Sequence, residues 1–311
     1  MKRTLVVAHD AGGAEVVSAW VKKNRPGADY SFLIEGPAAS IFLRKLGTIN
    51  ITDPSEMETS ISAADSVLTG TGYSSDLEKI AISSARLQGV PVASYLDHWT
   101  NYRERFELRG RLTLPNEIWA GDSHAVTMAQ EEFPDATVKF VENEYYLEMK
   151  EQIDAVPQPQ DDSGKCHVLY VTEPTSCAAE REHGDPRYWG YTEFEALDAY
   201  LFYLENISNR VAVIVRPHPA EPSSKYTGVI QKHQNALSIA ESSGRTLAED
   251  CAWADWVVGC DTLAMVIAVH AGRRVFSCIP RGGRQLSLPY PEIIQLFNQV
   301  GCRSLDTPAS P

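Results

Sequence analysis

The chain has 311 residues, of which 43% are apolar and 22% are charged, enough for two domains of ordinary size. Its 41 acidic side chains outnumber 28 Lys and Arg, and the net charge of −13 argues against a nucleic-acid backbone or an anionic membrane as the main partner. No apolar run reaches the roughly 18 residues of a membrane span. The apolar stretch within residues 1–10 is too short for a signal peptide and is soon followed by polar residues. We therefore expect a cytoplasmic protein.

The amino-terminal half alternates short β-branched runs with amphipathic stretches, which is typical of a parallel sheet covered by helices. We expect strands at 4–8, 30–34, 66–69, 91–96 and 117–120, and helices at 14–23, 38–46, 76–88 and 123–132. The pattern predicts a Rossmann-like domain over residues 1–152.

A composition break follows at 153–165, where prolines and a polar run leave little to pack, so we expect a linker there. A second α/β series covers 166–311, with strands at 167–171, 211–215, 256–259 and 274–278 and helices at 192–204, 262–271 and 291–300. The predicted fold class is α/β, with two open parallel-sheet domains facing a cleft. In such sheets ligands bind at the carboxyl ends of the strands.

The loop after the first strand contains Asp10, Gly12 and Gly13. The glycines allow the backbone to turn tightly and approach a ligand, and the following helix presents free N–H groups to an anion. The spacing is not that of a dinucleotide-binding fingerprint. Asp10 is well placed to be a general base, although a plain turn with Asp10 as helix cap explains the residues equally well.

The loop after the third strand, 70–76, is rich in small residues and includes Thr71 and Tyr73. Small residues permit close approach to a sugar or phosphate. Ser74 or Ser75 together with Glu78 also fits an ordinary capping box, and we favour that structural interpretation.

The segment 96–106 follows the fourth strand and includes Asp97, His98, Trp99 and Arg103. Aromatic faces with polar neighbours suit sugar rings. Asp97 and His98 are candidate catalytic groups, but adjacent side chains of an extended backbone point apart and cannot form a simple dyad. We expect one of them to face the cleft.

The run Arg216-Pro217-His218-Pro219 follows a strand of five apolar residues. The two prolines restrict the backbone around the histidine. Arg216 and His218 together are a sensible phosphate clamp, and a bound dianion would favour protonation of the imidazole. A surface turn is the alternative.

The strand at 256–259 leads to Asp261 and Thr262, which begin an apolar helix. Helix amino termini attract phosphate, although any buried helix can be capped this way. Residues 211–284 contain eight basic and six acidic side chains, so this segment is slightly positive within an acidic chain. That charge suits an anionic nucleotide.

The six cysteines, at 166, 177, 251, 260, 278 and 302, show no metal-binding spacing. We expect reduced, mostly buried thiols, and neither disulfides nor zinc ligands.

These motifs resemble those of GT-B glycosyltransferases, and within them bacterial surface-polysaccharide enzymes. The run from Arg216 to Pro219 is similar to the His-Pro motif by which sialyltransferases, polysialyltransferases and Kdo transferases hold the phosphate of a CMP-activated sugar, and Thr262 lies where they place a Ser or Thr. The chain lacks their acidic base motif. It also lacks the Asp-Tyr-Ser-Ser signature of teichoic-acid glycerophosphotransferases, which share the Pro-His-Pro run.

The resemblance implies an inverting, metal-independent transfer from a nucleotide-sugar to an acceptor hydroxyl, with no further cofactor. The donor-binding residues would be Gly12, Gly13, Arg216, His218, Pro219, Glu221, Asp261 and Thr262, and the acceptor-side residues Thr71, Tyr73, Trp99 and Arg103. Asp10 is our first choice of base and Asp97 the second. A UDP-N-acetylglucosamine 2-epimerase and a non-catalytic nucleotide-sugar-binding protein are the alternatives, and a homodimer is compatible with either.

Overall fold

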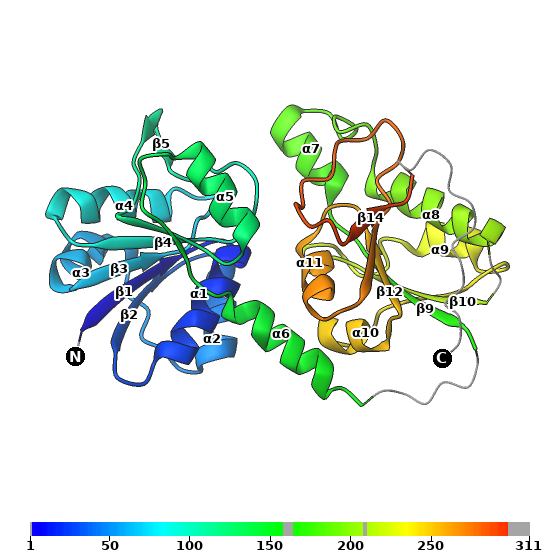
Figure 1. Ribbon diagram of the computed structural model, residues 1–311, viewed down its shortest axis with the longest axis horizontal. Helices are drawn as coiled ribbons and strands as arrows, with labels where there is room; N and C mark the ends of the chain where they lie inside the picture. Colours follow the sequence, from blue (N-terminus) through cyan, green and yellow to red (C-terminus); the bar gives the residue numbers. More distant parts are fainter. Residues whose placement is uncertain (1, 158–163, 208–209, 298–311) are drawn as a thin grey trace. The chain divides into compact units, whose positions relative to one another are not determined.

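The computed structural model describes residues 2–157, 164–207 and 210–297 (Figure 1). Their contacts divide the chain into two compact units, Met1–Glu148 and Met149–Pro311. We call these unit 1 and unit 2 and treat each by itself.

Unit 1 is built on a six-stranded sheet with the order β2-β1-β3-β4-β7-β8. Its strands are β1 (Arg3–Ala8), β2 (Asp29–Ile34), β3 (Ser66–Thr69), β4 (Val92–Leu96), β7 (Glu117–Ala120) and β8 (Val138–Phe140). All neighbouring strands are parallel; Val6 of β1, for example, lies opposite Phe32 and Leu68. The carboxyl ends of the strands therefore share one edge of the sheet.

Helices cover both faces of this sheet (Figure 1). They are α1 (Ala11–Asn24), α2 (Pro37–Leu46), α3 (Met57–Ala63), α4 (Leu77–Gln88) and α5 (Ser123–Glu132), with a 3-10 turn at Pro54–Glu56 and a hairpin of β5 (Glu107–Leu108) and β6 (Arg111–Leu112). A further helix, α6 (Glu144–Ala155), contains the boundary between the two units. Leu5 and Val7 of β1 pack in one apolar cluster, whereas Val6 and Ala8 pack in another. Successive side chains of a strand point to opposite faces, so β1 is apolar throughout.

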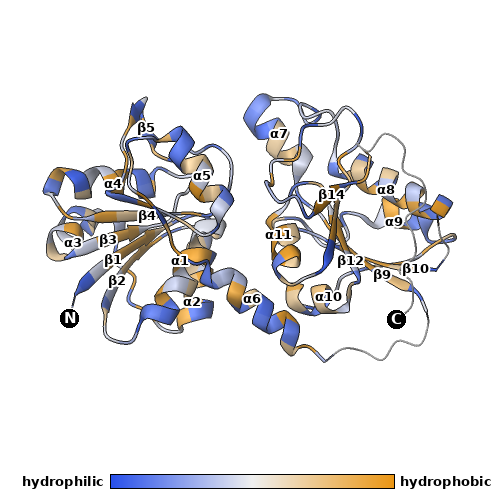
Figure 2. Ribbon diagram, in the orientation of Figure 1, coloured by the Kyte–Doolittle hydropathy of each residue, from blue (hydrophilic) through white to orange (hydrophobic). Residues whose placement is uncertain are grey.

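Unit 2 repeats this plan with the order β11-β10-β9-β12-β13-β14. Its strands are β9 (Cys166–Val171), β10 (Val211–Arg216), β11 (Ser238–Glu241), β12 (Trp256–Gly259), β13 (Arg274–Ser277) and β14 (Ile293–Gln295), again all parallel. Its helices are α7 (Thr175–His183), α8 (Glu193–Ile207), α9 (Thr227–His233), α10 (Leu247–Trp253) and α11 (Leu263–His270). Figure 2 shows how apolar residues concentrate on the strands of both units.

The predicted fold class is confirmed as α/β with two Rossmann-like parallel sheets, but two expectations about segments are wrong. Ile293–Gln295, placed in a helix at 291–300, form β14, where Ile293 lies opposite Val275. The β-branched pair at 293 and 294 completes the edge of the sheet, which outweighs its helix-like spacing. Residues 298–300 lie outside the described residues.

The expected linker at 153–165 begins too early, because α6 continues to Ala155. Ile153 has no exposed surface, and its burial extends the helix beyond the polar composition that suggested a break. Residues 158–163 of that linker lie outside the described residues.

None of the helices in the described part of the chain is long and apolar enough to cross a membrane. Five cysteines lie in that part, all as free thiols: Cys251, Cys260 and Cys278 are buried, Cys166 is half-buried and Cys177 is exposed. The sixth, Cys302, is outside the described residues.

Candidate functional site

Each sheet reverses its direction of growth beside its first strand. In unit 1, β1 lies between β2 and β3, and in unit 2, β9 lies between β10 and β12. Open α/β sheets bind ligands at the carboxyl edge at such a point. The loops that follow β1, β3, β9 and β12 are therefore the places where chemistry is expected.

In unit 1, Asp10 ties the loop after β1 to the loop after β3. Its carboxylate accepts hydrogen bonds from the backbone N–H groups of Tyr73 (2.7 Å) and Ser74 (2.9 Å) and from the Ser74 hydroxyl. Burial by itself would raise the pKa of Asp10, but these hydrogen bonds and the one to His9 outweigh it and lower the pKa. A carboxylate held in this way is a weak proton acceptor.

His9 is the group that Asp10 orients. Asp10 Oδ1 lies 2.7 Å from His9 Nδ1, so the carboxylate fixes the proton of the neutral ring on Nδ1 and leaves the Nε2 lone pair free to accept another. Gly36 makes room for the ring: its φ is +55°, and a Cβ there would lie 2.6 Å from His9 Nε2. The adjacency of His9 and Asp10 after a strand was the sequence signal for this pair, but our prediction selected only the aspartate.

Asp97, the second predicted base, belongs to a nearly buried ion pair. Arg105 Nη1 lies 2.6 Å from Asp97 Oδ1, and the Thr71 hydroxyl donates to the same oxygen at 3.0 Å. A Cβ at Gly12 would meet Asp97 Oδ2 at 2.1 Å. Gly12 therefore allows Asp97 to approach the backbone, and no ligand is needed to explain the glycine. Asp97 is better explained as a group that holds Thr71 and Arg105 in place.

Gly13 also serves packing, because a Cβ there would come within 3.2 Å of the Gly70 backbone. Thr71 is 1% exposed and Trp99 is 3% exposed, and the indole N–H of Trp99 donates to Asp122 at 3.1 Å. The structure does not leave Thr71 or Trp99 free to contact an acceptor, so we correct that expectation for both.

The other acceptor-side candidates differ in accessibility. Tyr73 is 43% exposed, and Arg103 is exposed with a long contact to Glu107, 3.6 Å. His98 is half-buried, with Nδ1 3.2 Å from the Thr100 hydroxyl. Of the predicted acceptor-side residues, Tyr73 and Arg103 are therefore the ones accessible from solvent.

Glu78 is a further ionisable group in unit 1, which sequence reasoning treated only as part of a helix cap. Its Oε1 accepts the backbone N–H of His9 at 2.8 Å, whereas Oε2 is buried without a hydrogen-bond partner among the described residues. Burial raises the pKa of Glu78 to about 7, and the backbone N–H groups of Glu78 and His9 only partly oppose it.

We expect the Glu78→Gln variant to remove a pH dependence of stability. The folded protein keeps a proton that the unfolded chain loses between pH 4.5 and about 7, so wild-type stability falls as the pH rises through that window, by roughly 3 kcal/mol in total for this group. Urea unfolding from pH 5 to 8 should show a flatter profile for the variant and a more stable variant at pH 8. Parallel profiles would contradict a buried, protonated Glu78.

In unit 2, two hydrogen bonds from its own backbone and one to its ring fix His218 in the turn after β10. Its N–H donates to the Thr172 hydroxyl (3.0 Å) and to Glu221 Oε2 (2.9 Å), and the Ala220 N–H donates to His218 Nδ1 at 3.1 Å. Because Nδ1 accepts, the neutral ring carries its proton on Nε2. Burial lowers the pKa of His218, and Glu221 offsets only part of this, so His218 presents a neutral N–H donor at pH 7.

Glu221 supports this turn from within. Its carboxylate accepts from the Thr172 hydroxyl (2.5 Å), Lys225 Nζ (2.7 Å) and the Tyr226 hydroxyl (2.7 Å), and its side chain is 1% exposed. We therefore correct the expectation that Glu221 touches a donor: it positions His218. Pro219 lies within the same turn.

Arg216 is engaged by a buried carboxylate. Its Nη1 lies 2.7 Å from Asp250 Oδ2 and 3.0 Å from the Arg245 carbonyl, and Asp250 has no exposed surface. Arg245 Nε lies 2.7 Å from the other oxygen of Asp250, so two guanidinium groups share this buried carboxylate. Arg216 therefore braces β10 against α10, and a phosphate would have to compete with Asp250 for it.

The loops after β9, β12 and β13 bring together a cluster that sequence reasoning mostly missed. Arg284 Nη2 lies 3.6 Å from Glu173 and 3.4 Å from Asp261, and its guanidinium stacks 4.5 Å from the Trp189 ring centre. Burial raises the pKa of Glu173 to about 7, with Arg284 opposing it. The basic residues that flank two glycines at 281–284, directly after a strand, were the available signal.

Asp261 and Thr262 differ in whether their side chains are already hydrogen-bonded within the protein. Asp261 accepts from the Ser287 N–H (3.2 Å) and hydroxyl (3.0 Å) and its side chain is 1% exposed, so it organises the loop. Thr262 is the N-cap residue of α11 but makes no side-chain cap bond. Its hydroxyl and the first N–H groups of α11 form a polar helix start of the kind that accepts an anion. Among the described residues, no three His, Cys, Asp or Glu side chains gather in a way that could hold a metal ion.

No family model matches the chain, and no curated protein matches it. Among solved structures, HepE of Anabaena in complex with UDP-glucose is similar, with 14% identity, a TM-score of 0.57 and coverage of 89% of this chain and 80% of that one. The complex of S. aureus MnaA with UDP has 12% identity, a TM-score of 0.61 and coverage of 90% and 79%. The UDP-GlcNAc 2-epimerase of Methanocaldococcus jannaschii has 11% identity, a TM-score of 0.59 and coverage of 96% and 89%.

At these identities the likeness defines the fold. The chain has a GT-B-like fold, composed of two Rossmann-like units that each carry a parallel sheet.

Proposed function

We propose that the protein is an inverting, metal-independent glycosyltransferase that moves a sugar from a UDP-linked donor to a hydroxyl of a saccharide or glycoconjugate. The observation that carries the proposal is the turn after β10, where Thr172, Glu221 and the Ala220 N–H hold His218 with its Nε2 proton available. A fixed, neutral N–H donor at the carboxyl edge of a sheet suits the oxygen of a departing phosphate.

Unit 2 is the proposed donor-binding unit. His218 would donate to the diphosphate, and the Thr262 hydroxyl with the start of α11 would supply further donors. UDP is favoured over the CMP that the His-Pro run suggested, because the similar folds of HepE and MnaA were determined with UDP or UDP-glucose. Arg284, stacked on Trp189, would supply a cation for a second phosphate oxygen.

Unit 1 is the proposed source of the base. His9 Nε2 would remove the proton of the acceptor hydroxyl as its oxygen attacks the anomeric carbon, and Asp10 would stabilise the imidazolium that forms. The bond between the anomeric carbon and the phosphate oxygen breaks, UDP departs with the bonding electrons, and the anomeric configuration inverts. His9 then releases the proton to solvent.

A nucleotide-sugar 2-epimerase is the second candidate, and the paired carboxyl groups of unit 2 favour it. Glu173, with its raised pKa, and Asp261 both lie within 3.6 Å of Arg284. An epimerase needs an acid and a base at one carbon, and two neighbouring carboxyl groups could serve as that pair.

A thermal-shift screen with UDP, CMP, CDP, GDP and ADP tests the donor assignment. A ligand that binds only the folded protein raises its unfolding midpoint with occupancy, so we expect UDP to give the largest shift. A larger shift with CMP would contradict the UDP assignment and return the donor to the class that the His-Pro run suggested.

A further inference from the structure

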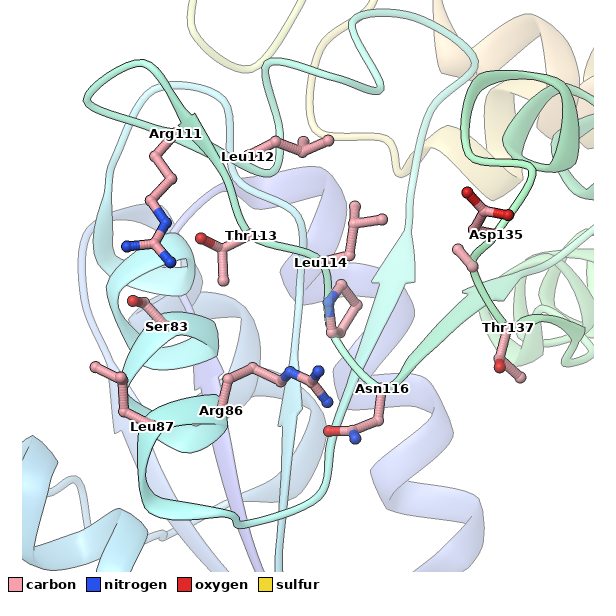
Figure 3. A pocket seen from close by; sticks show the side chains of 12 residues that line it. Ser83, Arg86, Leu87, Arg111, Leu112, Thr113, Leu114, Asn116, Asp135 and Thr137 are labelled. Carbon is pink, nitrogen blue, oxygen red and sulfur yellow. The ribbon is translucent and has the colours of Figure 1, made fainter.

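A cavity of about 670 Å³ lies in unit 1 away from the loops considered above (Figure 3). Its lining comes from the last turns of α4, the segment 111–116 that leads from β6 into β7, and the segment 135–137 that leads into β8. These segments lie at the amino ends of the parallel strands. The cavity is therefore at the opposite edge of the sheet from His9 and Asp10.

Two guanidinium groups of this cavity have no partner. In the part of the chain that the structure describes, the side chains of Arg86 and Arg111 make no hydrogen bond, ion pair or ring contact. Other arginines of the unit do pair with carboxylates: Arg44 contacts Glu15, and Arg105 contacts Asp97. Both side chains are exposed, so they are accessible cations of a cavity in a chain of charge −13.

Asn116 adds a third donor whose direction is settled. Its side-chain oxygen accepts the Val92 N–H at 3.0 Å, which assigns the oxygen and nitrogen of the amide and leaves its NH₂ group as a donor. Figure 3 shows Arg86 extending from α4 toward Asn116, and Arg111 reaching from the other side of the cavity toward α4. Arg86 and Asn116 therefore offer donors to one part of the cavity, and Arg111 offers a second guanidinium near Ser83.

The rest of the lining suits the hydroxyl groups of a sugar. Ser83, Thr113 and Thr137 contribute hydroxyls, and Asp135 contributes a carboxylate on the β8 side of the cavity. The volume lies within the roughly 300–1,000 Å³ range of small-molecule sites. Arg guanidinium groups favour planar or tetrahedral oxyanions, to which they donate two hydrogen bonds at once.

We propose that this cavity binds a saccharide-sized ligand that carries a phosphate or carboxylate group, with Arg86 and Arg111 holding the anion. The site is separate from the loops proposed for sugar transfer and goes beyond that function. A ligand here can act as an effector, or as a charged part of a longer saccharide that the protein retains.

Calorimetric titration of the full chain with glucose 1-phosphate, glucuronate and neutral glucose tests this site. The titrations are made at low salt, since screening weakens exposed charge pairs, and with UDP in excess so that the probes do not compete for the proposed donor site. The variants are Arg86→Gln and Arg111→Gln. Arg109→Gln is the matched control, because Arg109 is in the same hairpin but outside the cavity lining.

We expect at least one of the two anions to bind the wild-type chain and glucose to bind at least about tenfold more weakly, with the tighter anion identifying the preferred group. Each cavity variant should lose roughly tenfold or more in affinity, as for a charge-assisted hydrogen bond, and Arg109→Gln should stay within about twofold. Absence of binding by both anions, or equal binding by the wild type and both cavity variants, would overturn the proposal. Either result would leave the transfer function untouched.

Discussion

Replacement of His218 by Ala is expected to lower turnover by about 10²- to 10³-fold, the usual cost of removing one preorganised donor to a developing negative charge. The Nε2 proton of His218 is fixed by the hydrogen bond that Nδ1 accepts from Ala220, so the donor is in place before the donor sugar binds. UDP affinity should fall as well, because the product diphosphate uses the same proton. Initial rates and UDP titration together measure both effects.

Two further variants separate the donor role of His218 from support of the turn. His218→Gln places an amide N–H near the position of Nε2 and should recover part of the rate, whereas the shorter His218→Asn should not. His183→Ala is a control in the same unit and should not change the rate, since His183 is an exposed residue at the end of α7 whose ring stacks on Tyr188. Equal activity of the wild type and His218→Ala would contradict the role of His218 as the donor to the departing phosphate, on which the proposed function rests.

Replacement of His9 by Gln is expected to reduce turnover by about 10²- to 10⁴-fold, the range for loss of a general base, while UDP binding stays close to that of the wild type. Gln cannot take up a proton, although it retains a polar group beside Asp10. Single-turnover rates and UDP titration separate the two effects.

Two controls complete the test of His9. Added imidazole should restore part of the activity of His9→Ala, because this variant vacates the space that the ring occupies against Gly36. His98→Ala should have little effect, since Nδ1 of His98 lies 3.2 Å from the Thr100 hydroxyl, whereas Nδ1 of His9 lies 2.7 Å from the Asp10 carboxylate. Full activity of His9→Gln, or a larger loss of activity in His98→Ala, would contradict the assignment of His9 as the general base.

The apolar strands made the fold predictable. In β1 both side-chain sets are buried, so the run 4–8 has the continuous apolar character of a parallel strand covered on both faces. β14 was missed because three residues at a sheet edge carry little pattern of their own. Ile293 becomes a strand residue through its pairing with Val275, which no local spacing reveals.

The candidate site was predictable where one short segment defines it. The two prolines that flank His218 predict a rigid backbone there. The hydrogen bond to Thr172 could not be predicted, because it joins residues 46 positions apart. The exchange of roles between Asp10 and His9 depends on Tyr73 and Ser74, which lie on another loop. Trp99 looked like a sugar platform by residue type, and only its burial against Asp122 assigns it to packing.

The most direct test of the proposed function is NMR of the wild-type protein with UDP-glucose or UDP-N-acetylglucosamine, in EDTA, with and without saccharide acceptors. We predict UDP release and a glycoside of inverted anomeric configuration only when an acceptor is present. Formation of a 2-epimer from UDP-N-acetylglucosamine without any acceptor would contradict the transferase and establish the epimerase in its place.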